Sequence, residues 1–425
     1  MQGDQIAVNG IQYNWCRALE APVVVVCIDG NDPSYFEAMV KRGLLPNVER
    51  FLKTGFGTIA ETSLPAFTCP NNMSIITGTP TAVHGISGNF YLDRQTGEPV
   101  PMTSEALLRA PTVLSGFASK GLRCAAVTSK DKLCRQLGKG LQPGKDGSIV
   151  FSAEKAAAAT LDVNGIEHVP EWLGLPQPSV YSAELSLFVL EAGLKLVKEK
   201  RADVLYLSLS DYVQHAHAPE AEEAEAFYRE MDRLFGEIDQ TGAVLVLTAD
   251  HGMRDKADQE GRPNILWLQD DVDAEFGPGR ARVICPITDA YVAHHGALGG
   301  FVRIWVTEES GRDELVEKLL GFCAKLPGVE AAMTGGQAAE LLEMPLDREG
   351  DIVVFADSHH VIGSAKSRHD LSGLHGKRLR THGGLSESKV PLVMNRPLSE
   401  AARAEWAMRR IFNRSAFELA FNTGS

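Results

Sequence analysis

The chain has 425 residues, 44% hydrophobic and 23% charged, as in an ordinary globular protein with room for a large core and a second, smaller unit. Its formal net charge of −13 argues against a nucleic-acid partner, and its apolar runs are too short to cross a membrane. Seven scattered cysteines without a CxxC pair argue against disulfides and a thiolate metal site, and with no secretory leader in evidence we expect a cytoplasmic protein.

Four short apolar runs rich in β-branched residues predict strands that are buried on both faces of a parallel sheet. They are Val23–Ile28, Cys124–Val127, Val204–Leu209 and Ala243–Leu247. Helical stretches are expected at Pro33–Lys53 and Ala183–Lys200, and the alanine cluster Ala153–Thr160 is also interpreted as helix. This alternation of strands and helices predicts a doubly wound α/β sheet.

A change of pattern after residue 253 predicts a second unit. Residues 254–375 contain strand-like pieces at Phe301–Val306 and Ile352–Phe355, a helix near Glu314–Ala324, and joints rich in Gly and Pro. We therefore expect residues 1–253 and 376–425 to form a catalytic α/β core, with 254–375 as an inserted, smaller α+β cap.

Acidic residues stand where the predicted strands end, which is where ligands gather in such sheets. Asp29, Asp211 and the pair Asp250-His251 occupy these positions, and His215 follows Asp211 at helical i, i+4 spacing. His382 adds an imidazole nearer the carboxyl end. Taken singly, each motif is also compatible with a plain turn or loop; together they offer the nitrogen and oxygen donors that suit zinc, and also manganese or iron.

Thr68 lies in a Pro- and Asn-rich loop, Leu64–Asn72, that leads into an apolar segment. Pro70 suits an early helical position, so Thr68 is expected near a helix amino end, where backbone N–H groups favour an anion. The residues leave two roles open, a nucleophile and a simple helix cap.

Several motifs together resemble the nucleotide pyrophosphatase/phosphodiesterase branch of the alkaline phosphatase superfamily. They are Asp29-Gly30, Leu45-Pro46-Asn47, Phe67–Asn72, Thr77-Gly78, His84–Tyr91, Asp211-x3-His215, Asp250-His251-Gly252 and Thr381–Gly384. The resemblance covers roughly residues 21–253 and 376–396, and it implies an alkaline phosphatase-like, mostly parallel sheet with an inserted cap.

The resemblance also implies roles for individual residues. One zinc would be held by Asp29, Thr68, Asp250 and His251, and a second by Asp211, His215 and His382. Thr68 would be both ligand and nucleophile, passing through a phosphothreonine. Asn89 would donate a hydrogen bond to a phosphoryl oxygen.

Lys130 and Lys132 follow the predicted strand Cys124–Val127 and suggest a small anionic substrate, although a solvated lysine pair is the alternative. Within the branch, this pair resembles enzymes that hydrolyse the carbon–phosphorus bond of a small phosphonate, with lysines on the substrate carboxylate. We therefore expect a small-molecule phosphonate as the ligand, no nucleic acid or membrane partner, and leave a homodimer open.

Three other functions remain open. A phosphodiesterase or nucleotide pyrophosphatase would need a broad, aromatic pocket beyond Lys130, and a phosphosugar mutase would share the metals but return phosphate to its substrate. An inactive metal-binding scaffold fits the complete set of ligands poorly. Of the remaining histidines, His375 is passed over in favour of His382, and His217, His294-His295 and His359-His360 are expected mostly at the surface or in the cap.

Overall fold

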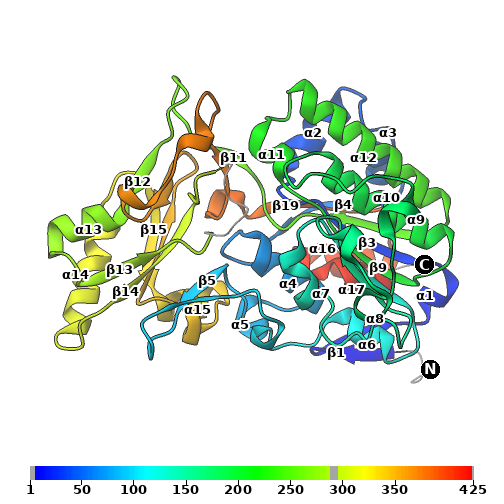
Figure 1. Cartoon of the computed structure of the whole chain (residues 1–425), viewed down its shortest axis with the longest axis horizontal. Helices are drawn as coiled ribbons and strands as arrows, with labels where there is room; N and C mark the ends of the chain where they lie inside the picture. The colour runs from blue at the N-terminus through cyan, green and yellow to red at the C-terminus, as the bar shows by residue number, and fades with distance from the viewer. Residues whose placement is uncertain (1–4, 288–294, 424–425) are drawn as a thin grey trace.

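The computed structural model describes residues 5–287 and 295–423. It has two lobes: a larger one, on the right in Figure 1, built on a seven-stranded sheet, and a smaller one built on a four-stranded sheet. The large sheet has the order β4-β19-β10-β3-β9-β7-β8. Its strands are β3 (Val23–Cys27), β4 (Phe56–Glu61), β7 (Cys124–Thr128), β8 (Ile149–Ser152), β9 (Val204–Ser208), β10 (Val244–Thr248) and β19 (Lys389–Met394).

The large sheet is mostly parallel. Strands β10, β3, β9, β7 and β8 pair in parallel, whereas β19 runs antiparallel to both β10 and β4. The four strands predicted from apolar runs are all present, with ends that agree to within one residue. The predicted fold class is therefore confirmed.

Strand β3 shows why these runs are continuously apolar. Val24 and Val26 belong to the core on one face of the sheet, whereas Val23 and Val25 belong to the core on the other. Because successive side chains of a strand point to opposite faces, a strand covered on both sides needs an apolar residue at every position.

Helices cover both faces of the large sheet. One face packs against α2 (Pro33–Lys41), α3 (Pro46–Thr54), α10 (Glu184–Lys198) and α12 (Glu222–Gln240). The other packs against α4 (Thr68–Thr77), α6 (Val113–Ala118), α7 (Cys134–Leu137) and α17 (Ala416–Asn422). This layering places the ends of the central strands at an edge that faces the smaller lobe (Figure 1).

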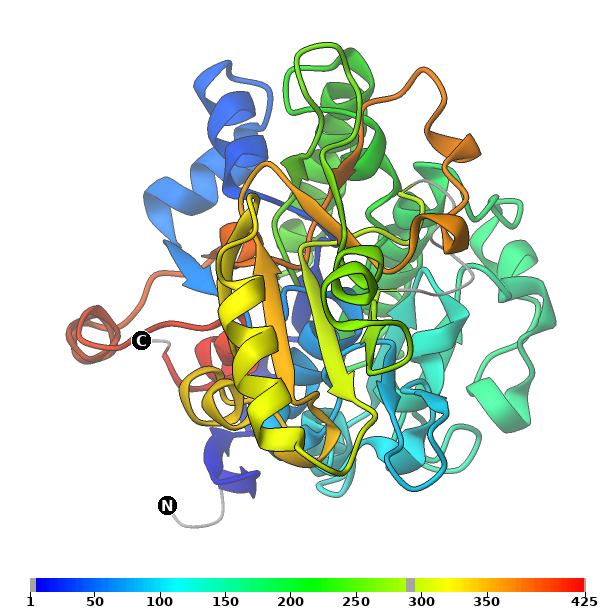
Figure 2. The same cartoon turned by 90° about the vertical axis from the view of Figure 1, so that its left-hand side faces the viewer.

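The smaller lobe is an antiparallel sheet with helices, and all of it lies between residues 254 and 375. Its strands, in the order β13-β14-β16-β15, are β13 (Ala281–Ile284), β14 (Phe301–Val306), β16 (Ile352–Ala356) and β15 (Val329–Thr334). Its helices are α13 (Leu268–Phe276), α14 (Arg312–Cys323) and α15 (Gly335–Leu342), and β12 (Ile265–Trp267) pairs with β17 (Val361–Gly363). Figure 2 shows α14 lying across the outer face of the sheet. We refer to this lobe as the cap; the boundaries at 253 and 376 remain predictions.

Smaller elements complete the described chain. The hairpins are β1 (Gln5–Val8) with β2 (Ile11–Asn14), and β5 (Phe90–Leu92) with β6 (Pro99–Pro101); β11 (Arg254–Asp255) pairs with β18 (Arg380–Thr381). The remaining α-helices are α1 (Arg17–Glu20), α5 (Thr81–His84), α8 (Leu161–Asn164), α9 (Val169–Leu173), α11 (Tyr212–Ala216) and α16 (Glu400–Ala407).

Two predictions of helix were wrong in detail. The stretch Pro33–Lys53 is two helices, because Gly43 turns the chain with a φ of 70° and Pro46 begins the second helix. The alanine cluster forms only a single 3-10 turn at Ala156–Ala158. Alanine favours helix, but so short a segment forms too few hydrogen bonds to offset the unfavourable nucleation of a helix.

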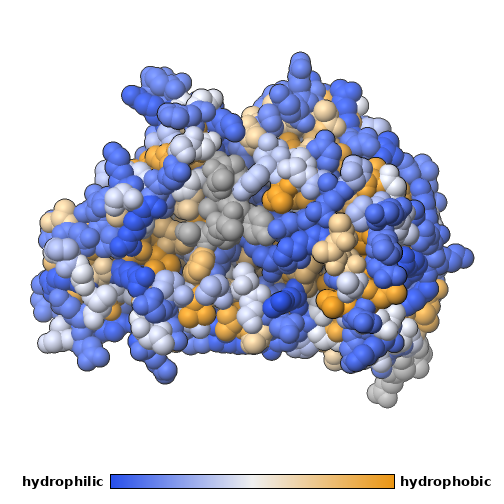
Figure 3. All heavy atoms as spheres, viewed as in Figure 1, coloured by the Kyte–Doolittle hydropathy of each residue, from blue (hydrophilic) through white to orange (hydrophobic). Residues whose placement is uncertain are grey.

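The surface carries little continuous apolar area on the face drawn in Figure 3, where hydrophobic residues form scattered groups among hydrophilic ones. Among the described residues, every helix is too short or too polar to serve as a transmembrane span. All seven cysteines are free thiols.

Candidate metal centre

Acidic side chains follow three neighbouring strands of the large sheet. Asp250 comes after β10, Asp29 after β3 and Asp211 after β9. The carboxyl ends of parallel strands meet at one edge, so these side chains converge although they are far apart in the chain. All three are almost completely buried.

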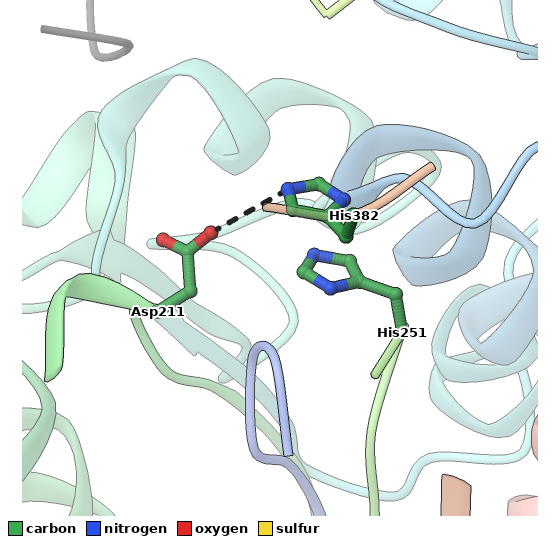
Figure 4. Close-up of side chains that lie close together, drawn as sticks. All are labelled: Asp211, His251 and His382. Carbon is green, nitrogen blue, oxygen red and sulfur yellow. Dashed lines mark ion pairs between the residues drawn. The ribbon is translucent and has the colours of Figure 1, made fainter. Parts of the chain in front are cut away.

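Two histidines join the aspartates in two overlapping clusters. Donor atoms of Asp29, Asp250 and His251 lie within 4.8 Å of one another, and so do those of Asp211, His251 and His382. Figure 4 shows the second cluster, in which His382 Nε2 lies 3.9 Å from an Asp211 oxygen. The rings of His251 and His382 stack with centroids 3.4 Å apart. His251 therefore stands between the two groups.

Backbone carbonyls fix the tautomers of three imidazoles. A carbonyl oxygen can only accept, so each Nδ1 in contact with one carries a hydrogen, and Nε2 is the ring nitrogen that faces the acidic side chains. The carbonyls are those of Arg380 for His215 (2.6 Å), Gly252 for His251 (2.8 Å) and Ala66 for His382 (2.8 Å). His215 Nε2 faces Asp211 at 2.9 Å. This is how metal-binding histidines are oriented.

Thr68 lies at the first position of α4, and its hydroxyl faces the first cluster. Its Oγ1 is 3.3 Å from His251 Nε2 and 3.5 Å from an Asp29 oxygen. The first turn of a helix has N–H groups without intrahelical partners, which favour an anion. The structure thus places a hydroxyl, an anion-binding helix end and the acidic cluster together.

Asn72 is a site residue to which the sequence analysis gave no role. Its amide donates to the Thr68 carbonyl (3.0 Å) and to an Asp250 oxygen (3.1 Å), and its own oxygen accepts from the Tyr206 hydroxyl (2.8 Å). Because Asn72 is one helical turn after Thr68, i, i+4 spacing on the predicted helix was the signal that could have found it.

The electrostatics of the centre favour a bound cation. Burial and the neighbouring carboxylate of Asp29 raise the pKa of Asp250 to about 8. Burial lowers the pKa of His251, but the carboxylates of Asp250 and Asp29 outweigh it and raise that pKa to about 9. Without metal, protons thus offset the crowded negative charge, and a divalent ion could take their place. Carboxylate, imidazole and hydroxyl donors fit zinc.

Lys130 lies against the acidic centre. Its Nζ is 2.8 Å from an Asp211 oxygen and 3.2 Å from an Asp29 oxygen. The side chain is buried, and its ammonium reaches one aspartate from each cluster. A cation at this position can also attract a negatively charged group of a substrate bound beside the clusters.

Lys132 and Asn89 occupy different surroundings from Lys130. Lys132 lines a surface pocket of about 490 Å³ to which Arg135 and Lys155 also contribute. Asn89 is buried, and its backbone N–H donates to the carbonyl of Pro286 at 2.7 Å. Lys130 therefore faces the acidic centre and Lys132 lines this pocket, and their shared role on a substrate carboxylate remains a prediction.

The other histidines differ in how well they were predicted. His295 belongs to residues 254–375, within the expected cap, but it is buried with its ring centroid 4.8 Å from that of His215, a position beside the clusters that the sequence did not reveal. His217 lies 3.5 Å from Glu223, and His375 lines a separate pocket with Arg378. His294 is outside the described residues.

Known proteins resemble this chain in both sequence and structure. The family of type I phosphodiesterases and nucleotide pyrophosphatases matches residues 23–377, and the chain belongs to this family of hydrolases. Within it, the chain is closely similar to phosphonoacetate hydrolase from Sinorhizobium meliloti 1021, in complex with phosphonoformate (43% identity, TM-score 0.91) or phosphonoacetate (42%, 0.91). Each comparison covers 98% of both chains.

More distant relatives share the fold. Murine ectonucleotide pyrophosphatase/phosphodiesterase 5 is 17% identical with a TM-score of 0.61, over 94% of this chain and 93% of that one. An uncharacterised pyrophosphatase/phosphodiesterase of Schizosaccharomyces pombe is 23% identical over 272 residues, or 61% of this chain. The chain spans about half the length of that curated relative.

Proposed function

We propose that this protein hydrolyses the carbon–phosphorus bond of phosphonoacetate, giving acetate and phosphate. The supporting observation is the similarity over 98% of both chains to phosphonoacetate hydrolase, including a structure that holds phosphonoacetate itself. The acidic clusters beside Thr68 and the ammonium of Lys130 supply groups suited to that chemistry.

The proposal includes two metal ions, which we take to be zinc. Asp29, Thr68, Asp250 and His251 would hold one, and Asp211, His215 and His382 the other. Such ions neutralise charge on a phosphoryl group and lower the pKa of a coordinated hydroxyl. His251 lies close enough to Asp211 and His382 to belong to both clusters, so it is the ligand whose assignment the geometry leaves open.

In the proposed reaction, each of these residues has its own role. The Thr68 hydroxyl gives its proton to water and its oxygen attacks phosphorus. The carbon–phosphorus bond breaks, and its electron pair delocalises into the carboxylate of the departing acetate carbanion. Lys130, with Lys132, stabilises that charge, Asn89 donates to a phosphoryl oxygen, and water protonates the carbanion. Water then hydrolyses the phosphothreonine to phosphate and free Thr68.

A substrate panel tests the activity. Protein loaded with zinc is incubated with phosphonoacetate, phosphonopyruvate and a chromogenic phosphodiester, and released phosphate or chromophore is measured before and after chelation. We expect phosphonoacetate to be turned over fastest and chelation to stop the reaction. Faster turnover of the diester, or phosphate release that survives chelation, would contradict the proposal.

The family match favours a second candidate, a phosphodiesterase or nucleotide pyrophosphatase. The cation beside the acidic centre argues against it, because Lys130 and the basic pocket around Lys132 suit a small acidic substrate better than a nucleoside. The same panel separates the two.

A cytoplasmic location remains part of the proposal. Seven free cysteines, five of them buried in the large lobe or the cap, suit a reducing compartment. Fractionation of cells that produce the protein would test it.

A further inference from the structure

The loop at residues 85–89, which carries Asn89, is held largely by the cap. Arg303, on β14, donates from Nη2 to the Ser87 carbonyl (2.8 Å) and to the Ser87 hydroxyl (2.9 Å). Arg348 donates from Nη1 to the Gly85 carbonyl at 2.5 Å. Figure 1 shows β5, which continues this loop, lying beside the cap strands β13 and β14.

Asn89 itself also forms hydrogen bonds to the cap. Its backbone N–H donates to the Pro286 carbonyl at 2.7 Å, and its side-chain amide donates to the Ile287 carbonyl at 3.3 Å. Both carbonyls belong to the segment that follows β13 of the cap. The residue that we place on the phosphoryl group therefore takes these contacts from the cap, although Thr68 belongs to the large lobe.

Arg303 holds the loop from an unusual environment, a completely buried ion pair. Its side chain is completely buried and forms a two-point ion pair with Glu349, with distances of 2.6 and 2.7 Å. Burying such a pair costs desolvation energy that the attraction does little more than repay. A role in stability alone therefore explains it poorly, whereas the rigid fork of arginine can fix the loop and the carboxylate in one arrangement.

Packing against the cap leaves no room for a side chain at Gly88. A Cβ added at Gly88 would lie 2.7 Å from Pro286 Cβ and 3.2 Å from Arg303 Nη1. Arg348 strengthens the same contact surface, because its Nη1 also donates to the Leu107 carbonyl at 2.9 Å. Both arginines thus contact this loop and not the residues of the metal clusters.

We propose that Arg303 and Arg348 are positioning residues that set the place of Asn89 opposite Thr68, so that the docked cap completes the phosphoryl-binding site. This inference rests on the proposed function through the role given to Asn89. It predicts that a change at Arg303 acts through Asn89, whereas a purely structural role predicts that the two residues act independently.

A double-mutant cycle separates these cases. Arg303→Lys keeps the charge and loses the fork, and we expect kcat/KM for phosphonoacetate to fall about tenfold, mainly through kcat. In an Asn89→Ala background, the same change should cost less than about twofold. Arg312→Lys is the matched control: it alters a two-point ion pair with Asp351 in the cap that does not touch the loop, and kcat/KM should stay unchanged.

The proposal is overturned if Arg303→Lys costs the same factor with and without Asn89, or if the folded variant keeps full activity. If Arg303→Lys does not fold, the cycle is run with Ser87→Ala, which leaves the Arg303–Glu349 pair intact and removes one acceptor. We then expect about a threefold loss that disappears with Asn89→Ala. A loss that persists there, or no loss, would overturn the proposal equally.

Phosphate binding keeps this test separate from that of the proposed function. The affinity of the zinc-loaded protein for inorganic phosphate is measured by calorimetry for the same variants. If wild-type protein does not hydrolyse phosphonoacetate, the proposed function fails, but the coupling between Arg303 and Asn89 is still measured in phosphate affinity. Additive effects there would overturn the inference alone.

Discussion

Asn72 links helix α4, which begins at Thr68, to an acidic residue of the centre. Its two amide hydrogens go to the Thr68 carbonyl and to Asp250, and its oxygen is held by Tyr206. Residues that hold metal ligands in place tune affinity because they fix which lone pairs face the ion. Asn72 is therefore the first place to look for an effect on metal binding without loss of a ligand.

Replacing Asn72 with alanine should weaken zinc binding about 10- to 100-fold, because Asp250 loses an orienting hydrogen bond. A competition titration with a chromogenic chelator measures this. Asn164→Ala removes an amide that donates to the Val150 carbonyl in another part of the large lobe, and it should leave zinc affinity unchanged. Equal zinc affinities for the Asn72 variant and wild type would show that Asp250 needs no such partner.

Single residues were predictable where strand ends decide their place. Asp29, Asp211 and Asp250 converge because three adjacent parallel strands end at one edge, and the apolar runs marked those ends. His295 and the contact of Lys130 with Asp211 were not predictable. They depend on how the cap docks and on which strands are neighbours, which local sequence does not encode. The ligand roles themselves remain predictions.

Helices α4 and α5 are joined by a buried histidine. Ile86 N–H donates to His84 Nδ1, so His84 carries its hydrogen on Nε2 and donates to the Ser74 hydroxyl at 2.9 Å. Burial, and then the positive charges of Arg414 and Arg348, lower the pKa of His84 from 6.5 to about 3. A histidine kept neutral in this way makes the fold sensitive to acid.

The direction in which pH changes the stability contributed by His84 follows from proton linkage. The unfolded chain binds a proton at this histidine near pH 6.5 and the folded chain only near 3, so the stability it contributes is intact near pH 7 and is lost as pH falls. Between pH 7 and 5 this group should lower the free energy of unfolding by about 2 kcal/mol. Urea unfolding of metal-free wild type and His84→Asn at both pH values measures it, and parallel pH dependences would contradict the assignment.

Elements were predictable to the extent that apolar pattern decides them. The run at β3 predicts its strand because both faces are covered, whereas the break between α2 and α3 depends on Gly43 and Pro46, which the apolar pattern alone did not reveal. Propensity predicts a helix for the alanine cluster, but its buried residues pack into the core around a single 3-10 turn. Propensity is a weak guide where tertiary contacts decide.

The centre joins segments from residue 29 to residue 382, so a bound ion would tie the fold together. Zinc that binds the folded chain in preference to the unfolded one stabilises it by about 2.7 kcal/mol at a hundred times its Kd. We expect chelation to lower Tm, added zinc to restore it, and magnesium to fail because it prefers an all-oxygen site. A Tm indifferent to chelation in protein shown to contain zinc would contradict this view of the centre.

The most direct test compares wild type and Thr68→Ala, both loaded with zinc, in phosphate release from phosphonoacetate, with metal content measured in the same samples. The proposed role of Thr68 predicts that the variant still contains zinc and loses at least about a thousandfold in turnover. Turnover near the wild-type rate by the zinc-containing variant would contradict attack by Thr68 and with it the proposed function of this centre.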